Sequence, residues 1–399
     1  MGGFPHFMNI SDMERSLLPA LMCTANRTQT NQQRVLWRIM KKTSKIAANI
    51  VLCCALPMLV TTNVQADGHT IGVSWADFET STRWRIDEAA MLEAIDAAGN
   101  SYVSRDAAGS PEKQLNDINA MVDEGADAII VLATDVEAIS SAIDYALDAD
   151  VSVIAYDRLI EREEVFYITF DNVEVGRMQA AAVFEAQPEG NYAFIKGSPT
   201  DANAELLFVG QMEVLEDAIA SGDIVNVGVE SAIGWSPDDA QQKMEKMLDD
   251  NNNNIDAVVA ANDGTAGGVI AALAQQQMDG DVPVSGQDGE AIALNRVARG
   301  LQTVSVWKDA RVLGGTAAEL ASLLADGVDV EMVPGSDYWS DGPNGTEMNV
   351  ILLDPEPITI DELDIVLDAG WIEKEVLCEG AIPAATACGG STVSSLDDD

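Results

Sequence analysis

Polar and aromatic side chains follow several short apolar runs of this 399-residue chain, at the point where each run ends. Asp157 and Arg158 follow the run 151–156, and Asn262 follows the run 255–260. The candidate site residues found in this way are Arg83, Trp84, Asp157, Arg158, Asp201, Asn203, Trp235, Asn262, Asp288 and Lys308. Carboxylates and amides bind vicinal hydroxyl groups, Arg and Lys supply charge-assisted donors, and an indole covers the apolar face of a pyranose ring. This combination is typical of a sugar-binding site.

The sequence contains few residues suited to nucleophilic catalysis or to the binding of phosphates and dinucleotides. His69 is the only histidine beyond residue 66, which disfavours a Ser-His-Asp triad or a Cys-His pair. The chain has neither a phosphate-binding glycine loop of the Walker type nor an ordered dinucleotide fingerprint. We therefore predict no catalytic residue, no metal and no cofactor. Two carboxylates suffice for a glycosidase, so composition alone leaves that class of enzyme open.

The elements that must position these residues alternate along the chain. Short apolar runs, beginning with 70–75, are separated by amphipathic stretches such as 82–98. Strands buried on both faces and separated by helices indicate parallel sheets. Because the series is too long for one small sheet, we predict an α/β fold with two doubly wound lobes. Ligands bind at the carboxyl edge of such sheets, where the candidate residues lie.

Each candidate residue also has a simpler explanation. Asp and Asn at strand ends commonly cap the following helix, and a cap alone would account for Asp201 or Asn262. Gln287 also follows an apolar run, together with Asp288. The number of strand ends that carry such residues, rather than any one of them, favours a binding site.

The charge of the chain excludes some partners. There are 22 basic and 66 acidic residues, a net charge of −44, which would repel nucleic acid and anionic membranes. Residues 1–66 hold seven basic and two acidic groups. Residues 67–399 therefore hold 15 basic and 64 acidic groups, a net charge of −49. A single binding site uses only a few of these acidic residues. We interpret the rest as a solvated surface suited to high salt, as in the acidic proteome of a halophile.

The basic N-terminal region has the features of an export signal. A positive segment at 40–45 precedes an apolar run at 46–60, which is short for a membrane span. Val64-Gln65-Ala66 then matches a small-x-small cleavage site. We predict a signal peptide cleaved after Ala66, rather than a buried helix or an anchor, and a periplasmic mature protein. Met40 is the expected true start, within an N-terminal extension of residues 1–66.

Two cysteines lie beyond residue 66, Cys378 and Cys388. In an oxidising compartment they could form a disulfide, and two free thiols on a mobile tail are the alternative. A zinc site is not expected from two cysteines without a nearby histidine. We predict that residues 376–399 form a C-terminal tail.

Four strings of the sequence resemble one known family. They are VIAYDR at 153–158, GSPTDANA at 197–204, DAVVAAND at 256–263 and SGQD at 285–288. Together with Gly234-Trp235-Ser236-Pro237, they resemble the periplasmic xylose-binding proteins of ABC transporters, in the ribose/galactose-type sugar-binding group. The similarity runs from about Thr70 to Ala325. The segment 335–348 and the tail with the two cysteines depart from the family pattern.

The resemblance implies the fold of a type I periplasmic binding protein, in which two lobes joined by a three-strand hinge close over one sugar. It implies a first lobe of residues 67–170 with 309–331. It implies a second lobe of residues 171–308 with 332–375.

The family's binding roles carry over to matching positions of this chain. They fall on Arg83, Trp84, Asp157 and Arg158 in the first lobe, on Asp201, Asn203, Asn262 and Asp288 in the second, on Lys308 near the hinge, and on Trp235 against the ring. The implied ligand is D-xylose, with glucose, arabinose and galactose as alternatives. The implied partners are an ABC permease of the inner membrane and, for a chemosensory receptor, a chemoreceptor.

Two other classes of protein compete with this reading. The effector domain of a LacI-type regulator shares the fold, but it would need a helix-turn-helix head and a cytoplasmic address. A secreted carbohydrate-active enzyme would turn over xylosides. The predicted export signal and the acidic mature chain argue against the regulator, and an assay for xyloside turnover would distinguish the enzyme from the leading hypothesis, a non-enzymatic binding protein that feeds an ABC importer.

Overall fold

The computed structural model describes residues 68–79 and 81–389. The predicted start, export signal and cleavage site, and the segment after Gly389, lie outside the described residues. The strands are β1 (Thr70–Trp75), β2 (Ser101–Asp106), β3 (Ala128–Val131), β4 (Ser152–Tyr156), β5 (Phe166–Phe170), β6 (Gly190–Lys196), β7 (Ile224–Ser231), β8 (Ala257–Ala260), β9 (Ser285–Gln287), β10 (Val304–Trp307), β11 (Asp337–Trp339), β12 (Met348–Leu353) and β13 (Glu356–Ile358).

Helices alternate with most of these strands. The α-helices are α2 (Arg83–Ala97), α3 (Pro111–Asp123), α4 (Val136–Asp148), α5 (Asn172–Ala186), α6 (Ala202–Ser221), α7 (Pro237–Asp250), α8 (Asp263–Gln275), α9 (Ala291–Ala298), α10 (Ala310–Ala325), α11 (Leu363–Asp368) and α12 (Lys374–Leu377). Three short 3₁₀ helices within the described residues are η2 (Ile233–Trp235), η3 (Val330–Met332) and η4 (Thr386–Cys388).

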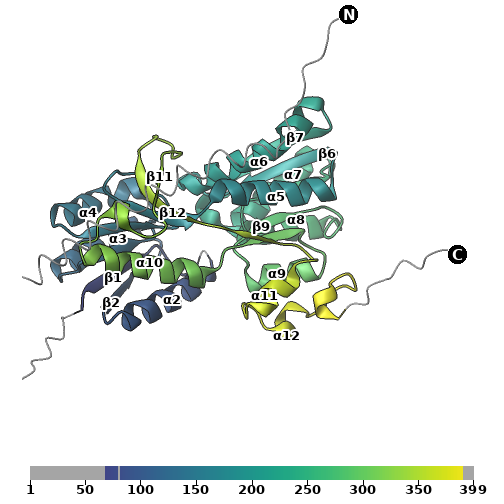
Figure 1. Cartoon of the computed structure of the whole chain (residues 1–399). Coiled ribbons are helices and arrows are strands. Elements are labelled where there is room, and N and C mark those ends of the chain that lie inside the picture. Colours follow the sequence, from purple (N-terminus) through teal and green to yellow (C-terminus); the bar gives the residue numbers. More distant parts are fainter. Residues whose placement is uncertain (1–67, 80, 390–399) are drawn as a thin grey trace, which may run out of the picture. The chain divides into compact units, whose positions relative to one another are not determined.

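The first lobe is built on a sheet with the strand order β11-β12-β5-β4-β3-β1-β2. Its strands pair in parallel, apart from the antiparallel pair of β11 and β12. Successive side chains of a strand point to opposite faces, so each face has its own core. Ile130 packs with residues of α2 and α10, and Ile129 packs with residues of α3 and α4. Figure 1 shows these two pairs of helices on opposite sides of the sheet.

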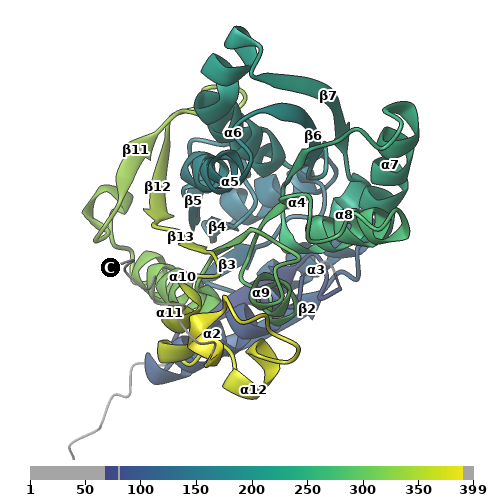
Figure 2. The same ribbon diagram turned by 90° about the vertical axis from the view of Figure 1, so that its right-hand side faces the viewer.

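The second lobe contains the strand sets β7-β6-β8 and β9-β10-β13, which a parallel bridge between Val258 and Val284 connects. Phe194 packs with residues of α5 and α6, whereas Ile195 packs with residues of α7 and α8. Figure 2 shows β6 and β7 between these helix pairs. Two parallel-sheet lobes covered by helices on both faces confirm the predicted fold class.

The described chain passes between the lobes at three places. Phe170 ends β5 in the first lobe, and Asn172 begins α5 in the second. The chain returns after Trp307, the end of β10, and crosses again between β12 and β13. These connections correspond to the three-strand hinge that the resemblance implies. Asp171 caps α5 by accepting a hydrogen bond from the Glu174 backbone N–H at 3.0 Å.

The predicted lobe boundaries need one correction. Residues 332–375 were assigned to the second lobe, but β11 and β12 extend the first sheet beside β5. Met348 and Val350 of β12 join the core of that lobe, and this burial fixes the placement. The carboxylate of Glu161, between β4 and β5, accepts hydrogen bonds from Asn344 and Thr346, and these bonds hold the loop between β11 and β12.

The chain beyond β13 packs on the second lobe. The side chain of Asn295, on α9, donates hydrogen bonds to the backbone oxygens of Val376, Leu377 and Glu379 at 2.8–3.2 Å. The predicted tail 376–399 is therefore a packed segment as far as residue 389. Cys378 and Cys388 are bonded through their sulfurs, with the Cα atoms 5.3 Å apart. Within the described residues, no helix has the length and apolar character needed to cross a membrane.

Candidate functional site

An inner cavity lies between the two lobes, at the carboxyl ends of their strands. Its wall consists of Ser81, Trp84, Asp157, Arg158, Asp201, Asn203, Trp235, Asn262, Gln287, Asp288 and Lys308. Nine of the ten predicted site residues therefore share one wall, and the tenth, Arg83, lies behind it. The cavity volume is ≈ 30 Å³, room for about one water molecule. A sugar ring can enter only when the lobes move apart.

Arg83 is the buried ionic centre of this region. At the start of α2, its guanidinium is 2.5 Å from Asp157, 3.1 Å from Asp288 and 3.3 Å from Asp87. Asp157 follows β4 in the first lobe and Asp288 follows β9 in the second, so Arg83 joins the two lobes. The sequence groups Arg83 with the wall residue Trp84 and does not show that Arg83 lies behind the wall, with its guanidinium 4.3 Å from the centre of the Trp84 ring.

The charges of this cluster stabilise one another. Burial alone would lower the pKa of Arg83, but the carboxylates of Asp157, Asp87 and Asp288 raise it well above its ordinary value. Burial would likewise raise the pKa of Asp157, but Arg83 and then Lys308 hold it below its ordinary value. Asp157 is therefore an ionised acceptor at neutral pH, which suits charge-assisted hydrogen bonds to hydroxyl groups.

Asp87 supports Arg83 from the side away from the cavity. It accepts hydrogen bonds from the Arg83 guanidinium and the Tyr156 hydroxyl, and it is completely buried. Burial raises the pKa of Asp87 to about 7, against the opposing effect of Arg83. The sequence offered no signal for this role, because Asp87 lies inside a predicted helix rather than at a strand end.

A chain of hydrogen bonds runs along the hinge side of the cavity. Lys308 Nζ donates to Asn172 Oδ1 at 3.1 Å, and Asn172 Nδ2 donates to Asn203 Oδ1 at 3.1 Å. Asn203 Nδ2 then donates to the backbone oxygen of Asp157 at 2.9 Å. Burial lowers the pKa of Lys308, although Asp157 partly opposes this effect. The chain thus connects α6 and β10 of the second lobe with β4 of the first.

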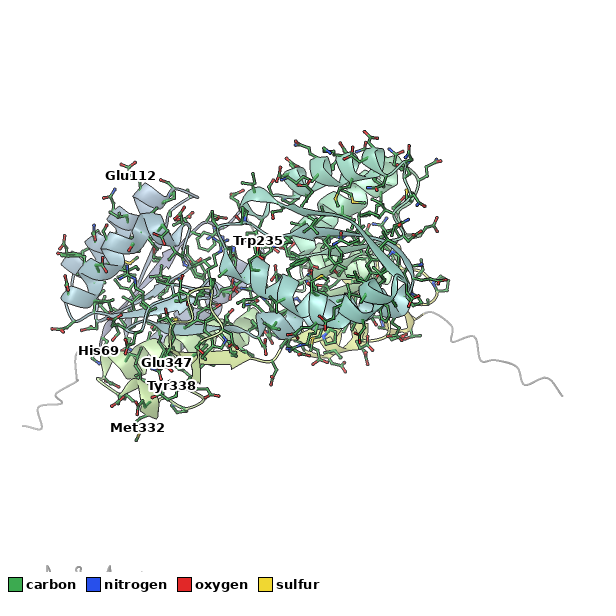
Figure 3. The ribbon with its side chains drawn as sticks, turned by 90° about the horizontal axis from the view of Figure 1, so that it is seen from above. His69, Glu112, Trp235, Met332, Tyr338 and Glu347 are labelled. Carbon is green, nitrogen blue, oxygen red and sulfur yellow. A yellow bond between two sulfur atoms is a disulfide. The ribbon has the colours of Figure 1, made fainter. Side chains whose placement is uncertain are left out.

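Trp235 lies where the two lobes meet, as Figure 3 shows. It ends η2, and its indole rests on the backbone of Gly197: a Cβ there would be 2.1 Å from the ring. The indole Nε1 donates to Asp201 Oδ2 at 3.1 Å. Glycine at 197 and the carboxylate at 201 therefore fix the plane of the ring that would stack on a sugar.

The helix-cap explanation and the site explanation both hold for two residues. Asp201 caps α6 by accepting from the Asn203 backbone N–H at 3.0 Å, while its other oxygen accepts from Trp235. Asn262 caps α8 by accepting from the Thr265 backbone N–H at 2.9 Å. The cap uses the Asn262 carbonyl oxygen, which leaves its amide nitrogen as the donor toward the cavity.

Three wall residues have backbone conformations that side chains rarely adopt. The φ angles are +60° at Asp157, +60° at Trp235 and +101° at Asp288. Such conformations cost on the order of 1–3 kcal/mol each and persist where the surroundings enforce them. Ion pairs hold Asp157 and Asp288, and the packing on Gly197 holds Trp235. The strain is concentrated where the side chains must face the cavity.

The structure adds two residues to the predicted set, Ser81 and Gln287. Gln287 is 4% exposed, and its side-chain oxygen has no hydrogen-bond partner among the described residues. A buried acceptor without a partner is costly unless a ligand satisfies it. The sequence analysis noted Gln287 beside Asp288 at the end of an apolar run but did not include it among the candidates, whereas Ser81 matches no pattern.

A second contact joins the lobes beside Ser81. The Ser81 hydroxyl donates to Glu290 Oε1 at 2.9 Å, and the Thr82 backbone N–H donates to the same oxygen at 3.3 Å. Ser81 and Thr82 precede α2 in the first lobe, and Glu290 precedes α9 in the second. Burial raises the pKa of Glu290, and Asp288 raises it further. This contact and the Arg83–Asp288 ion pair hold the cavity closed.

The wall can bind a neutral polyhydroxyl ring from both sides. Carboxylates, amides and cations offer acceptors and donors, and two indoles offer flat apolar faces. The described residues contain no group of three or more His, Cys, Asp or Glu side chains placed to hold a metal. Two α/β lobes with such a wall between them define a bilobal binding protein.

Comparison with known proteins agrees with this class. Residues 71–329 match the model of the periplasmic binding protein domain, and the chain belongs to this family. It is 39% identical to the D-xylose-binding periplasmic protein of Escherichia coli (strain K12) over 281 residues, 70% of this chain and 85% of the relative. The protein of the same name from Haemophilus influenzae is 37% identical over 309 residues, 76% of this chain and 91% of the relative.

Solved structures show the same fold. An ABC transporter solute binding protein from Clostridium phytofermentans with bound β-D-glucose has a TM-score of 0.70 and 25% identity, covering 77% of this chain and 99% of that one. A carbohydrate transporter solute binding protein from Chloroflexus aurantiacus, in complex with D-glucose, has a TM-score of 0.68 and 26% identity. The match covers 77% of this chain and 97% of that one. These relatives confirm the family resemblance found in the sequence.

Proposed function

We propose that this protein binds D-xylose, or a closely related aldose, between its two lobes and delivers it to an ABC importer. The observation that carries the proposal is the inner cavity, whose wall gathers hydroxyl-binding groups from seven separate segments of the chain. The identity of 37–39% to two D-xylose-binding periplasmic proteins supports the choice of sugar.

Binding follows from closure of the lobes. Asp157 and Arg158 belong to the first lobe, whereas Asn262 and Asp288 belong to the second, so an open molecule offers a sugar half of its partners. Closure lets both sets bind the ring and removes it from water. The sugar therefore stabilises the closed form by its higher affinity for that form. The closed form is the state that the importer recognises.

D-Glucose is the second candidate ligand. Two solved relatives of 25–26% identity carry it, and glucose differs from xylose only by the substituent on C5. Arabinose and galactose are less favoured.

The cellular setting extends the same proposal. We assign the mature protein to the periplasm, after cleavage of an export signal behind Ala66. Its partner is the permease of an ABC importer in the inner membrane, and a chemoreceptor is a further candidate. The family consists of binding proteins, which supports a role without catalysis. Incubation with xylosides should give no turnover, and measurable hydrolysis would favour a secreted enzyme instead.

A thermal-shift panel of aldoses tests the ligand, followed by calorimetry on the sugars that stabilise the protein. D-Xylose should give the largest increase in melting temperature. A larger shift with glucose, arabinose or galactose would reassign the ligand within the same class. No shift with any aldose would overturn the proposed function.

A further inference from the structure

A larger outer cavity adjoins the inner one between the same two lobes. Its volume is ≈ 260 Å³, against ≈ 30 Å³ for the inner cavity. At about 30 Å³ for each water molecule, this is room for roughly nine of them, more than one pentose ring displaces. The two cavities share Arg158, Asp201 and Trp235 in their walls. A ring bound in the inner cavity therefore borders the outer cavity at these three side chains.

Both lobes contribute polar groups to the outer wall. Asp77 and Thr134 follow β1 and β3 in the first lobe, and Ser198 and Thr200 follow β6 in the second. These are again carboxyl ends of strands, the edge at which ligands bind in open α/β sheets. Because the two lobes supply different parts of the wall, closure would hold a ligand here just as it holds one in the inner cavity.

The outer wall has groups that can bind hydroxyls. The Thr134 hydroxyl donates to Gln114 Oε1 at 2.8 Å, so its own oxygen can still accept a hydrogen bond. The Ser198 hydroxyl accepts from the Gly234 backbone N–H at 3.3 Å and lies 3.0 Å from the Thr200 hydroxyl. Ordered hydroxyls of this kind suit a ligand that both donates and accepts.

The remaining wall selects the charge and shape of the ligand. The wall carries two carboxylates, Asp77 and Asp201, against one cation, Arg158, which lies 3.4 Å from Asp201, and this net negative charge disfavours sugar phosphates and sugar acids. Ala133, Val136 and Leu159 provide an apolar surface for the C–H face of a ring. The combination fits a neutral sugar unit rather than an anion or a wholly apolar molecule.

We propose that the outer cavity is a second sugar subsite, which holds a neutral ring joined by a glycosidic bond to the ring in the inner cavity. The ligand class is then a disaccharide of the bound aldose, for which xylobiose is a suitable probe. This inference rests on the proposed function. The shared residues Arg158, Asp201 and Trp235 would lie beside the glycosidic bond.

Calorimetry with matched pairs of sugars tests the subsite: D-xylose with xylobiose, and D-glucose with cellobiose. The wild-type protein should bind the disaccharide of its preferred aldose at least as tightly as the aldose, or within tenfold of it. Disaccharide binding more than tenfold weaker than aldose binding would overturn the subsite and leave the proposed function intact. Failure of all four sugars to bind would overturn the subsite, and failure of arabinose and galactose as well would overturn the proposed function.

Variants that fill the outer cavity complete the test. The two filling variants are Val136→Trp, at a half-buried position on α4, and Thr200→Trp, at an exposed position. Each should weaken disaccharide binding at least tenfold and change aldose binding less than twofold. Val209→Trp is the control, because Val209 is 48% exposed on α6 and lines neither cavity. If Val136→Trp fails to fold, Thr200→Trp alone decides. Undiminished disaccharide binding in a folded filling variant would overturn the subsite.

Discussion

At the scale of single residues, the site depends on side chains whose backbone conformation is enforced by their partners. Asp157 has a φ of +60° and is held by Arg83, and Trp235 has the same φ and is held against Gly197. The residue types and strand-end positions were readable from the sequence. The sequence also predicted that these residues meet at one site, but not which of them contact each other, because segments far apart in the chain supply the wall.

Asp157→Ala and Trp235→Ala should each weaken aldose binding by about tenfold or more. The first removes an ionised acceptor for hydroxyl groups, and the second removes the stacking surface for the ring. Calorimetry on both variants measures the loss, with circular dichroism to verify folding. Wild-type affinity in both variants would contradict the assignment of the inner cavity.

Gln287→Leu should weaken aldose binding by about fivefold. A hydrogen bond from a sugar hydroxyl to the buried Gln287 oxygen contributes about 1 kcal/mol, and Leu of similar size cannot accept it. Gln242→Leu, at an exposed position on α7, is the matched control. Affinity equal to that of the control would show that this oxygen does not contact the ligand.

At the scale of elements, the starts of α2 and α9 form the contact that closes the lobes. Glu290→Ala removes the acceptor of two hydrogen bonds from Ser81 and Thr82, so the closed form loses stability. We expect aldose affinity to fall about threefold to tenfold, whereas Glu290→Gln, which keeps an acceptor oxygen, should stay within about twofold of wild type.

Calorimetry gives these affinities, and small-angle scattering of the sugar-free protein reports the opening. Glu93→Ala, at an exposed position on α2, is the control for loss of a surface charge. Equal affinity and equal dimensions for Glu290→Ala and wild type would mean that the contact does not govern closure.

The elements themselves were predicted with mixed success. Strand–helix alternation is a local pattern, and it indicated both lobes correctly. The assignment of β11 and β12 was wrong, because the chain stays in the first lobe after α10, and β12 pairs with β5 there before the chain crosses to β13. Pairing between strands separated by some 180 residues leaves no local pattern that distinguishes one sheet from the other.

At the scale of the whole molecule, buried carboxyl groups make stability depend on pH. Burial, and then Glu290, raise the pKa of Asp263 to about 8 from its ordinary 3.8. The unfolded chain ionises this carboxyl near its ordinary pKa, whereas the folded chain keeps its proton. The free energy of unfolding therefore decreases as pH rises between about 4 and 8.

Asp263→Asn should flatten this dependence. Urea unfolding of wild type and variant at pH 5, 6, 7 and 8 measures the slopes, and their difference isolates Asp263 from the other carboxyl groups. Wild type should lose more stability than the variant over this range. Parallel slopes would contradict the raised pKa.

The net charge of −49 on residues 67–399 leads to a prediction about salt. Screening reduces repulsion among exposed carboxylates, so the melting temperature should rise between about 0.1 M and 2 M KCl. Differential scanning calorimetry measures the change. A melting temperature that stays constant or falls would count against adaptation to high salt.

The sequence by itself determined the α/β class, the hydroxyl-binding residue types and the strand ends that carry them, because hydrophobic periodicity and residue chemistry are local properties. Only the tertiary structure decided that Arg83 lies behind the wall, that Gln287 and Ser81 join it, and that an outer cavity adjoins it. These facts depend on which distant segments meet when two lobes pack, and no local pattern encodes that meeting.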